Sequence, residues 1–248
     1  MPVAVDKQKS ISVFFPCYND EGSIAKLVED SFETLKTLTD DYEVIVVDDG
    51  SRDKSRQILS GLEKRYRNLK LVFHQKNQGY GGALKSGFKA ATKDLIFYTD
   101  GDGQYDVKEL PVLLSLMSDD VDFVNGIKMA RRDATYRIVI GNMYSLVTRW
   151  IFMLPVYDVD CDFRLIRKTV LDKLDLESNS GSICVELVKK SQRAGAKFRQ
   201  VSVHHFERQW GKSQFFRFSK LLSTFFEILR LWVEMVITSR AMRPRSKK

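Results

Sequence analysis

The sequence predicts an α/β fold in which helices cover both faces of a mainly parallel central sheet. Two observations support this prediction. Short apolar runs rich in β-branched and aromatic residues alternate with amphipathic stretches along residues 10–125, the order expected of right-handed β–α–β units. Polar loops follow three of these runs, and the C-terminal ends of parallel strands share the sheet edge where α/β proteins bind ligands.

Each strand expected in the first half is an apolar run that stops at loop-forming residues. The first run stops at Pro16, with Asn19 and Gly22 close behind, and the second runs into Asp48. Strands are therefore expected at residues 10–15, 42–47, 69–74, 95–99 and 121–125. Helices are expected between them: up to residue 39, after a cap at Asp53, and over residues 79–91 and 107–117.

The pattern changes in the second half of the chain. Residues 138–154 predict a helix that is apolar nearly all round, broken only by Asn142, Ser145 and Arg149, so burial in the core is expected rather than contact with lipid. A short strand after residue 162, a helix over 183–194 and a strand over 198–203 follow. Residues 215–237 predict an amphipathic helix whose wide apolar face suits packing on the domain or lying on a membrane.

Length and composition favour one domain over residues 1–214, followed by the amphipathic helix and a basic tail at 215–248. A chain of 248 residues with 44% hydrophobic content can bury a substantial core. Its formal net charge of +8 indicates an anionic partner. The basic residues of the predicted site lie beside acidic strand ends. A nucleic-acid-binding protein would carry them in a continuous basic stripe, so no nucleic-acid partner is expected.

Cysteine usage and hydropathy indicate where the protein works. The three cysteines have no paired spacing, which points to a reducing compartment and packed thiols. The N-terminal residues lack the apolar core of a signal peptide, and no uncharged apolar run reaches the roughly 18 residues needed to span a bilayer. A cytoplasmic protein is expected, with peripheral contact to the cytoplasmic face of a membrane.

The stretch Asp100-Gly101-Asp102 directly follows the apolar run 95–99, which places its two carboxylates at the C-terminal end of a strand. The intervening glycine lets both carboxylates turn toward one point, where they would repel each other without a cation. Mg²⁺ commonly takes one or two protein carboxylates and completes its shell with substrate phosphate oxygens. The pattern predicts a metal–diphosphate site, and a polar turn that caps the next helix is the alternative.

Two other loops carry side chains suited to a nucleotide. Asp49 can accept a hydrogen bond from a ribose hydroxyl or a base N–H, and Tyr18 can pack on a base. A late polar loop contains Arg208 and Lys212, cations of the kind that neutralise a diphosphate. Each residue alone has a plainer interpretation as turn chemistry or a solvated loop. Acidic or aromatic groups at equivalent strand ends together favour a nucleotide site.

Six motifs taken in order resemble family 2 glycosyltransferases of the GT-A fold, most closely the dolichyl-phosphate mannosyltransferase-like branch, whose members glycosylate polyprenyl phosphates. The resemblance covers about residues 10–215. Its motifs are residues 16–21, residues 47–51, Asn77 with Gly79 and Gly82, residues 100–104, residues 163–165 and residues 208–213.

The resemblance implies specific roles for residues in these motifs and a requirement for Mg²⁺ or Mn²⁺. It implies nucleotide contacts from Pro16, Tyr18, Asp20, Val47 and Asp49, a metal and diphosphate site organised by Asp100, Asp102 and Gln104, and an Arg208 that closes over the donor phosphates. The sequence also departs from the branch. Lys128 stands where arginine is usual, and Gln214 replaces a basic residue for which Lys212 can substitute.

The reaction expected is inverting transfer of a sugar from a GDP- or UDP-linked donor. A polyprenyl-phosphate acceptor is already an anionic nucleophile, so it requires no general base. A hydroxyl acceptor requires a carboxylate to take its proton, for which Glu186 is the first candidate and Asp162 the second. A sugar-nucleotide pyrophosphorylase and a basic membrane- or nucleic-acid-binding module are the competing classes. The first lacks its lysine-rich glycine loop, and the second lacks its basic stripe.

Overall fold

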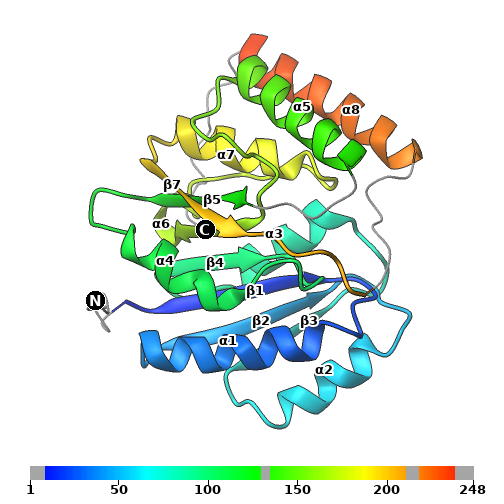
Figure 1. Ribbon diagram of the computed structural model, residues 1–248, viewed down its shortest axis with the longest axis vertical. Coiled ribbons are helices and arrows are strands. Elements are labelled where there is room, and N and C mark those ends of the chain that lie inside the picture. Colours follow the sequence, from blue (N-terminus) through cyan, green and yellow to red (C-terminus); the bar gives the residue numbers. More distant parts are fainter. Residues whose placement is uncertain (1–8, 130–134, 211–217, 238–248) are drawn as a thin grey trace.

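A seven-stranded sheet forms the centre of the protein (Figure 1). The computed structural model describes residues 9–129, 135–210 and 218–237. The strands are β1 (Ile11–Cys17), β2 (Tyr42–Asp48), β3 (Leu69–Phe73), β4 (Leu95–Thr99), β5 (Phe123–Met129), β6 (Phe163–Arg167) and β7 (Phe198–His204), in the order β3-β2-β1-β4-β6-β5-β7. Strand β6 is antiparallel to both neighbours and every other pairing is parallel, so the predicted mainly parallel sheet is confirmed.

Helices cover both faces of this sheet, as the alternating pattern predicts. Helices α1 (Ile24–Leu38), α2 (Ser55–Glu63) and α4 (Leu110–Ser115), with the 3-10 turn η1 (Val107–Glu109), share one apolar cluster with the first face. Helices α3 (Tyr80–Ala90), α6 (Lys168–Leu171) and α7 (Ile183–Arg193) share a second cluster with the opposite face. Helices α5 (Thr135–Phe152) and α8 (Phe218–Trp232) pack onto this second cluster, and the π-helical turn η2 (Val233–Ile237) continues α8. Figure 1 shows α5 and α8 at the end of the molecule far from α1 and α2.

The central strands are apolar on both sides because helices cover both faces. Every residue of β1 is buried, and its alternate side chains Phe14 and Phe15 belong to the two different clusters. Phe14 stacks on Tyr98 of β4 and meets Phe88 of α3 edge to face, with ring centroids 5.3 and 5.0 Å apart. These contacts fix β4, and hence the stretch that follows it, against β1.

Several element boundaries differ from those expected. Strand β1 continues through Pro16, which the sequence places in a loop, because residues up to Cys17 stay in register with β2. Strand β5 begins two residues later than expected and runs to Met129, because it pairs with β7 along its whole length. The helix expected over 107–117 is instead η1 followed by the short α4, and the Asp106 side chain caps η1 by accepting from the Lys108 amide at 3.0 Å.

Helix α5 exposes most of its described apolar side chains, although Phe152 at its end is buried, so the prediction of core burial is wrong. Ser145 and Thr148 are 8% and 3% exposed, whereas Trp150 is 76% and Leu146 54% exposed. The Thr148 hydroxyl donates to the Tyr144 carbonyl oxygen at 2.7 Å within the helix, so its burial loses no hydrogen bond. The apolar surplus that suggested a core helix therefore lies on the outer surface.

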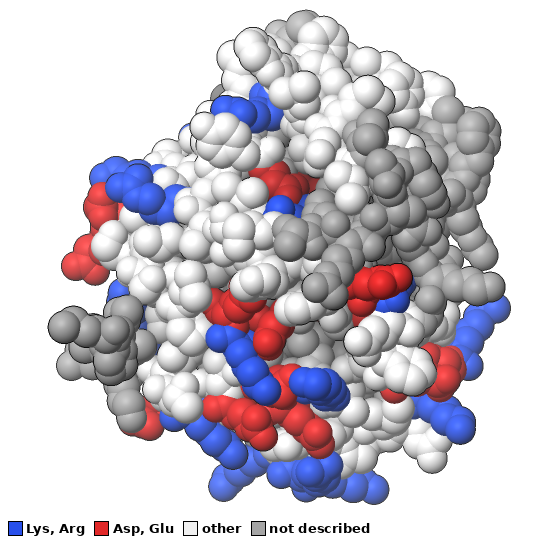
Figure 2. All heavy atoms as spheres, in the orientation of Figure 1, with Lys and Arg blue, Asp and Glu red and all other residues white. Residues whose placement is uncertain are grey.

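Helix α8 is amphipathic, as expected, and its outer face is also apolar. Leu231 and Met235 are buried in the second cluster, while Phe225 and Phe226 are 60% and 58% exposed. Figure 2, in the same orientation, shows few charged side chains on the end of the molecule that carries α5 and α8. None of the helices in the described residues is long and apolar enough to cross a bilayer. The proposed boundary at residues 214/215 lies outside the described residues.

Candidate active site

The C-terminal ends of β2, β1 and β4 lie side by side, because these strands are parallel neighbours. The loops that follow them carry Asp49, Asp20 and Asp100. The loop after β4 comes close to the end of β1 at Gly101, where a Cβ atom would lie 2.4 Å from the Pro16 carbonyl oxygen. Gly101 does not have a positive φ, so glycine is needed here for close approach and not for unusual backbone angles.

Four carboxylates form an acidic cluster at this edge: Asp20, Asp100, Asp102 and Asp162. Burial, followed by the charges of Asp162 and Asp102, raises the pKa of Asp100 well above its ordinary value. Burial also raises the pKa of Asp20 to about 6, and the charge of Asp102 acts in the same direction. Both shifts show that negative charge is unfavourable here, and a bound cation would relieve it.

Arg208 brings positive charge to the acidic cluster from the loop after β7. Its Nη2 and Nε atoms lie 2.5 and 3.2 Å from Asp102 Oδ2. The loop is fixed at Phe206, whose amide donates to the Gln104 carbonyl oxygen at 2.8 Å and whose carbonyl oxygen accepts from Gln104 Nε2 at 3.0 Å. Gln104 therefore anchors the Arg208 loop, a role that differs from the metal contact predicted for it.

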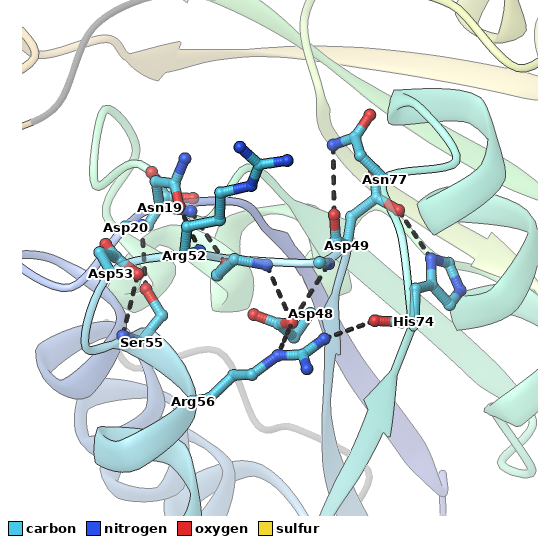
Figure 3. A network of polar contacts seen from close by, with 12 residues as sticks. Asn19, Asp20, Asp48, Asp49, Arg52, Asp53, Ser55, Arg56, His74 and Asn77 are labelled. Carbon is cyan, nitrogen blue, oxygen red and sulfur yellow. Dashed lines mark hydrogen bonds and ion pairs between the residues drawn. The ribbon is translucent and has the colours of Figure 1, made fainter.

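Asp49 organises the turn that follows β3 (Figure 3). Its Oδ1 accepts from the Gln78 amide and lies 2.7 Å from His74 Nδ1, and its Oδ2 accepts from the Gly79 amide at 3.0 Å. The side chain is 5% exposed. Since a carboxylate has about four acceptor positions, the three groups that already contact Asp49 leave little capacity for the predicted ribose or base contact.

The loops after β1 and β2 are locked together by a polar network (Figure 3). Asp48 Oδ1 lies 2.7 Å from Arg56 Nε, and this guanidinium also donates to the His74 carbonyl oxygen. Across the two loops, Asn19 donates its amide to Ser51 Oγ at 3.0 Å and accepts from the Arg52 amide at 2.8 Å. The sequence analysis assigned no role to Asp48 or Arg56. In the structure they join the end of β2 to α2 and to His74, the residue that follows β3.

The remaining predicted nucleotide contacts have different degrees of access. Tyr18 is partly exposed, and its amide donates to Asp20 Oδ2 at 2.9 Å. Val47 is fully buried in the second cluster, so it can reach a nucleotide only through its backbone. Pro16 pairs with Val47 in the sheet and directs its carbonyl oxygen toward Gly101.

Lys128, at the end of β5, is turned toward the segment before β6. Its Nζ donates to the Asp160 carbonyl oxygen at 2.7 Å and lies 3.4 Å from Asp158 Oδ1, and the side chain is 6% exposed. Burial raises the pKa of Asp160 to about 7, against the opposing effect of the Lys128 charge. A substrate contact by Lys128 would have to share these partners. Lys212 lies outside the described residues.

Glu186, the first candidate for a general base, is fully buried and holds a loop. Its Oε1 and Oε2 accept from the Glu177 and Ser178 amides at 2.9 and 2.8 Å, and Lys190 Nζ lies 2.5 Å from Oε1. Burial alone would raise the pKa of Glu186, but these hydrogen bonds lower it below its ordinary value. The geometry favours a structural role for Glu186.

Asp162, the second candidate, lies within the acidic cluster because β6 runs antiparallel to β4 and its start pairs with the end of β4. Asp162 Oδ1 lies 3.3 Å from Tyr98 Oη and 3.7 Å from Arg164 Nη1. Arg164 is completely buried, and it donates to Tyr98 Oη at 2.6 Å and to Asn125 Oδ1 at 2.8 Å. The structure thus favours Asp162 over Glu186 as a group near the reacting atoms.

Tyr80 is a candidate site residue that was not predicted from the sequence. Its hydroxyl donates to Asp100 Oδ1 at 2.7 Å from the first position of α3. The signal in the sequence is the run Gly79-Tyr80-Gly81-Gly82, which does not fit a dinucleotide-binding motif because it follows the third strand and not the first. In the structure this run brings the start of α3 close to the acidic cluster.

The side chains present fit a hard divalent cation completed by substrate. Asp100 and Asp102 offer carboxylate oxygens, the ligands that Mg²⁺ and Mn²⁺ prefer, and the raised pKa of Asp100 shows a need for positive charge. Within the described ranges, no three His, Cys, Asp or Glu side chains come together as a ready-made metal site. Two carboxylates with phosphate oxygens would suffice.

Solved structures show that the fold is that of GT-A glycosyltransferases. Glucosyl-3-phosphoglycerate synthase from Mycobacterium tuberculosis, in complex with Mn²⁺, UDP and phosphoglyceric acid, superposes with a TM-score of 0.70 at 16% identity, over 91% of this chain and 78% of that one. The same enzyme with Mg²⁺ and UDP gives a TM-score of 0.67 at 17% identity, covering 91% and 79%.

Curated relatives and a family model identify the chain. An undecaprenyl-phosphate 4-deoxy-4-formamido-L-arabinose transferase from Yersinia enterocolitica is 27% identical over 90% of this chain and 68% of its own length. The protein of the same name from Photorhabdus laumondii is 28% identical, covering 92% and 69%. The model of glycosyl transferase family 2 matches residues 12–175, about two thirds of the sequence. The chain therefore belongs to glycosyl transferase family 2.

Proposed function

We propose that this protein transfers a sugar, with inversion, from a nucleotide-diphosphate sugar to a polyprenyl phosphate at a membrane surface. The observation that carries the proposal is the placement of Asp100 and Asp102 together at the β4 edge, with Arg208 hydrogen-bonded to Asp102. Carboxylates for a cation and a guanidinium for phosphates are the two groups that a departing diphosphate requires. The names of the relatives, which act on undecaprenyl phosphate, support the acceptor class.

On the donor side, each residue has a separate task. Asp100 and Asp102 would hold Mg²⁺ or Mn²⁺, which stabilises negative charge on the leaving diphosphate. Arg208, which already lies between Asp102 and the loop after β7, would neutralise the phosphates. Tyr18 is exposed enough to pack on the base, and either a uridine or a guanosine donor is compatible with these contacts.

On the acceptor side, a lipid phosphate is an anion and attacks without losing a proton. No general base is then needed. This agrees with the structural role of Glu186, whose carboxylate accepts from two loop amides. The acceptor lies in a bilayer, so the protein must reach the membrane surface. The exposed apolar residues of α5, α8 and η2 support peripheral contact with the cytoplasmic face: Ile140, Met143, Leu146, Val147, Trp150, Ile151, Phe225, Phe226, Leu229 and Val233.

Nucleotide release tests this function. The full chain is incubated with UDP- and GDP-sugars and Mn²⁺, with or without undecaprenyl phosphate in anionic vesicles, and nucleoside diphosphate is measured. Release that needs both the metal and the lipid phosphate is expected from one donor class. Turnover with a hydroxyl acceptor and none with lipid phosphate would contradict the proposal.

A hydroxyl acceptor is the second candidate, favoured by the placement of Asp162 in the acidic cluster. In that reaction Asp162 would accept the proton of the attacking hydroxyl. Asp162→Asn separates the two candidates. A loss of turnover of roughly 100-fold or more is expected if Asp162 is the base, whereas transfer to lipid phosphate should retain most of its rate.

A further inference from the structure

Helix α8 is tied to residues 177–182, the segment between α6 and α7. Glu227 Oε2 accepts from Ser180 Oγ at 2.7 Å and from Ser182 Oγ at 2.6 Å. One turn further on, Arg230 Nη2 lies 2.9 Å from Glu177 Oε2. The polar side chains of α8 thus meet this segment, while the phenylalanines Phe225 and Phe226 remain exposed.

The same segment lies directly on the start of α3. The Gly81 amide donates to the Asn179 carbonyl oxygen at 3.0 Å. A Cβ atom at Gly79 would lie 2.4 Å from that oxygen, and one at Gly81 would lie 2.4 Å from the Ser178 carbonyl oxygen. Lys85 of α3 donates to the Glu177 carbonyl oxygen at 2.9 Å. Backbone lies against backbone here, so a shift of the segment must be passed to α3.

The start of α3 in turn holds two groups of the active site. The Tyr80 hydroxyl donates to Asp100 Oδ1, and the Gly79 amide donates to Asp49 Oδ2. Tyr80 is therefore the last member of a continuous series of contacts that begins at Glu227. Each step is a hydrogen bond or a backbone contact between described residues.

We propose that Tyr80 positions Asp100 for the divalent cation. Residues 177–182 couple the position of the Asp100 carboxylate to the packing of α8 against this segment. The inference rests on the metal site of the proposed function. It extends that function, because the helix that carries exposed apolar side chains would influence cation affinity at the sheet edge. Because such coupling is reciprocal, cation binding would stabilise the packing of α8 against residues 177–182.

Mn²⁺ binding to the full chain tests the coupling, with calorimetry or the EPR signal of free Mn²⁺ as the readout. Tyr80→Phe is expected to weaken Mn²⁺ binding about 10-fold, the lower end for loss of a group that orients a metal ligand. Glu227→Gln should weaken it by roughly 3-fold, and the double variant should lose less than the product of the two. Glu63→Gln, at the exposed last position of α2, removes a carboxylate charge away from this series of contacts; it is the matched control and should bind like wild type.

A second variant guards against misfolding, and a second measurement tests reciprocity. Ser182→Ala removes one donor to Glu227 and should also weaken Mn²⁺ binding, with an unchanged circular dichroism spectrum. Mn²⁺ should slow hydrogen exchange of α8 amides in wild type and not in Tyr80→Phe.

The possible failures are distinguishable. If wild type binds no Mn²⁺, the metal site of the proposed function is contradicted, and so is the coupling that depends on it. If wild type binds Mn²⁺, unchanged affinity in folded Glu227→Gln and Ser182→Ala variants overturns the coupling alone. The coupling is also overturned if the loss of Mn²⁺ affinity in the Tyr80→Phe, Glu227→Gln double variant equals the product of the two single losses. Independent sites show no interaction energy in such a double-mutant cycle.

Discussion

At the scale of residues, the two carboxylates of the Asp100-Gly101-Asp102 motif have different surroundings. Asp100 is hydrogen-bonded to Tyr80 and lies near Asp162, and burial is the main cause of its raised pKa. Asp102 is paired with Arg208. Arg208 therefore provides positive charge where the cation is expected, and it must share or release Asp102 when a metal binds.

Asp102→Asn is predicted to keep the fold and remove most metal-dependent donor binding. The side chain lies in a loop, where its partners are the Gln104 amide and Arg208, and asparagine can still accept from both. Its charge is needed for the cation, so donor affinity with Mn²⁺ should fall by roughly 100-fold. Thermal shift with and without Mn²⁺ measures this. A folded variant that retains wild-type stabilisation by Mn²⁺ and donor would refute the site.

Asp20→Asn is predicted to stabilise the metal-free protein above about pH 6. The folded-state pKa of Asp20, about 6, is higher than the unfolded value, so wild type loses stability as pH rises toward and through 6. Asparagine does not ionise and avoids this loss. An increase in Tm of roughly 2–4 °C, the effect of about 1 kcal/mol in a domain of this size, is expected at pH 7.5 in EDTA.

The pH dependence provides the control for this variant. At pH 4 the folded wild type carries a protonated Asp20, so the two proteins should melt close together. A constant difference between pH 4 and pH 7.5 would show that packing and not ionisation separates them.

At the scale of elements, α5 and α8 have apolar faces that the domain does not cover. Trp150 lies at the end of α5 beside Arg149, whose guanidinium lies 4.0 Å from the centre of the Tyr157 ring. Tryptophan and tyrosine beside a cation suit the interface between lipid headgroups and acyl chains. The exposed Phe225 and Phe226 on α8 add apolar area on the same end of the molecule.

Trp150→Glu combined with Phe225→Glu is predicted to abolish binding to anionic vesicles and leave the fold intact. Both side chains are mostly exposed, so a charge there costs little stability in water but opposes insertion into lipid. Flotation measures the binding. Val112→Glu, at an exposed apolar position of α4, is the matched control and should float like wild type.

At the scale of the whole molecule, charge and apolar surface act together. The chain carries a net charge of +8, and residues 240–248 contain no acid but five basic residues: Arg240, Arg243, Arg245, Lys247 and Lys248. Family membership excludes the two competing classes from the sequence analysis, a pyrophosphorylase and a non-enzymatic basic module. The proposed division into residues 1–214 and 215–248 would not separate catalysis from membrane contact, because α5 in the first part also carries exposed apolar side chains.

Vesicle binding is predicted to be salt-sensitive and to fall when residues 240–248 are removed. Each basic residue near an anionic leaflet contributes about 1 kcal/mol, and this contribution decreases as salt shortens the screening length. Flotation of the full and shortened chains at low and high salt measures both effects. Full-length protein that stays in the soluble fraction at low salt would contradict membrane contact and favour a soluble acceptor.

The sequence by itself determined the fold class and the position of the acidic motif. Strand β4 was predicted with its observed bounds, because a short apolar run followed by Asp100-Gly101-Asp102 permits few other structures. The alternation of strands and helices similarly determined the parallel part of the sheet. These features are local, and so periodicity and turn chemistry suffice to predict them.

Only the tertiary structure decided which polar groups meet and which apolar face is covered. The Tyr80 hydroxyl donates to Asp100 from a different element, and the Glu186 carboxylate accepts from a backbone amide of the loop before α7. Ser145 and Thr148 of α5 are buried and most of its described apolar side chains are exposed, although its composition suggested a core helix. These outcomes depend on partners distant in sequence, because burial and hydrogen bonding are decided by what packs against a side chain and not by its neighbours along the chain.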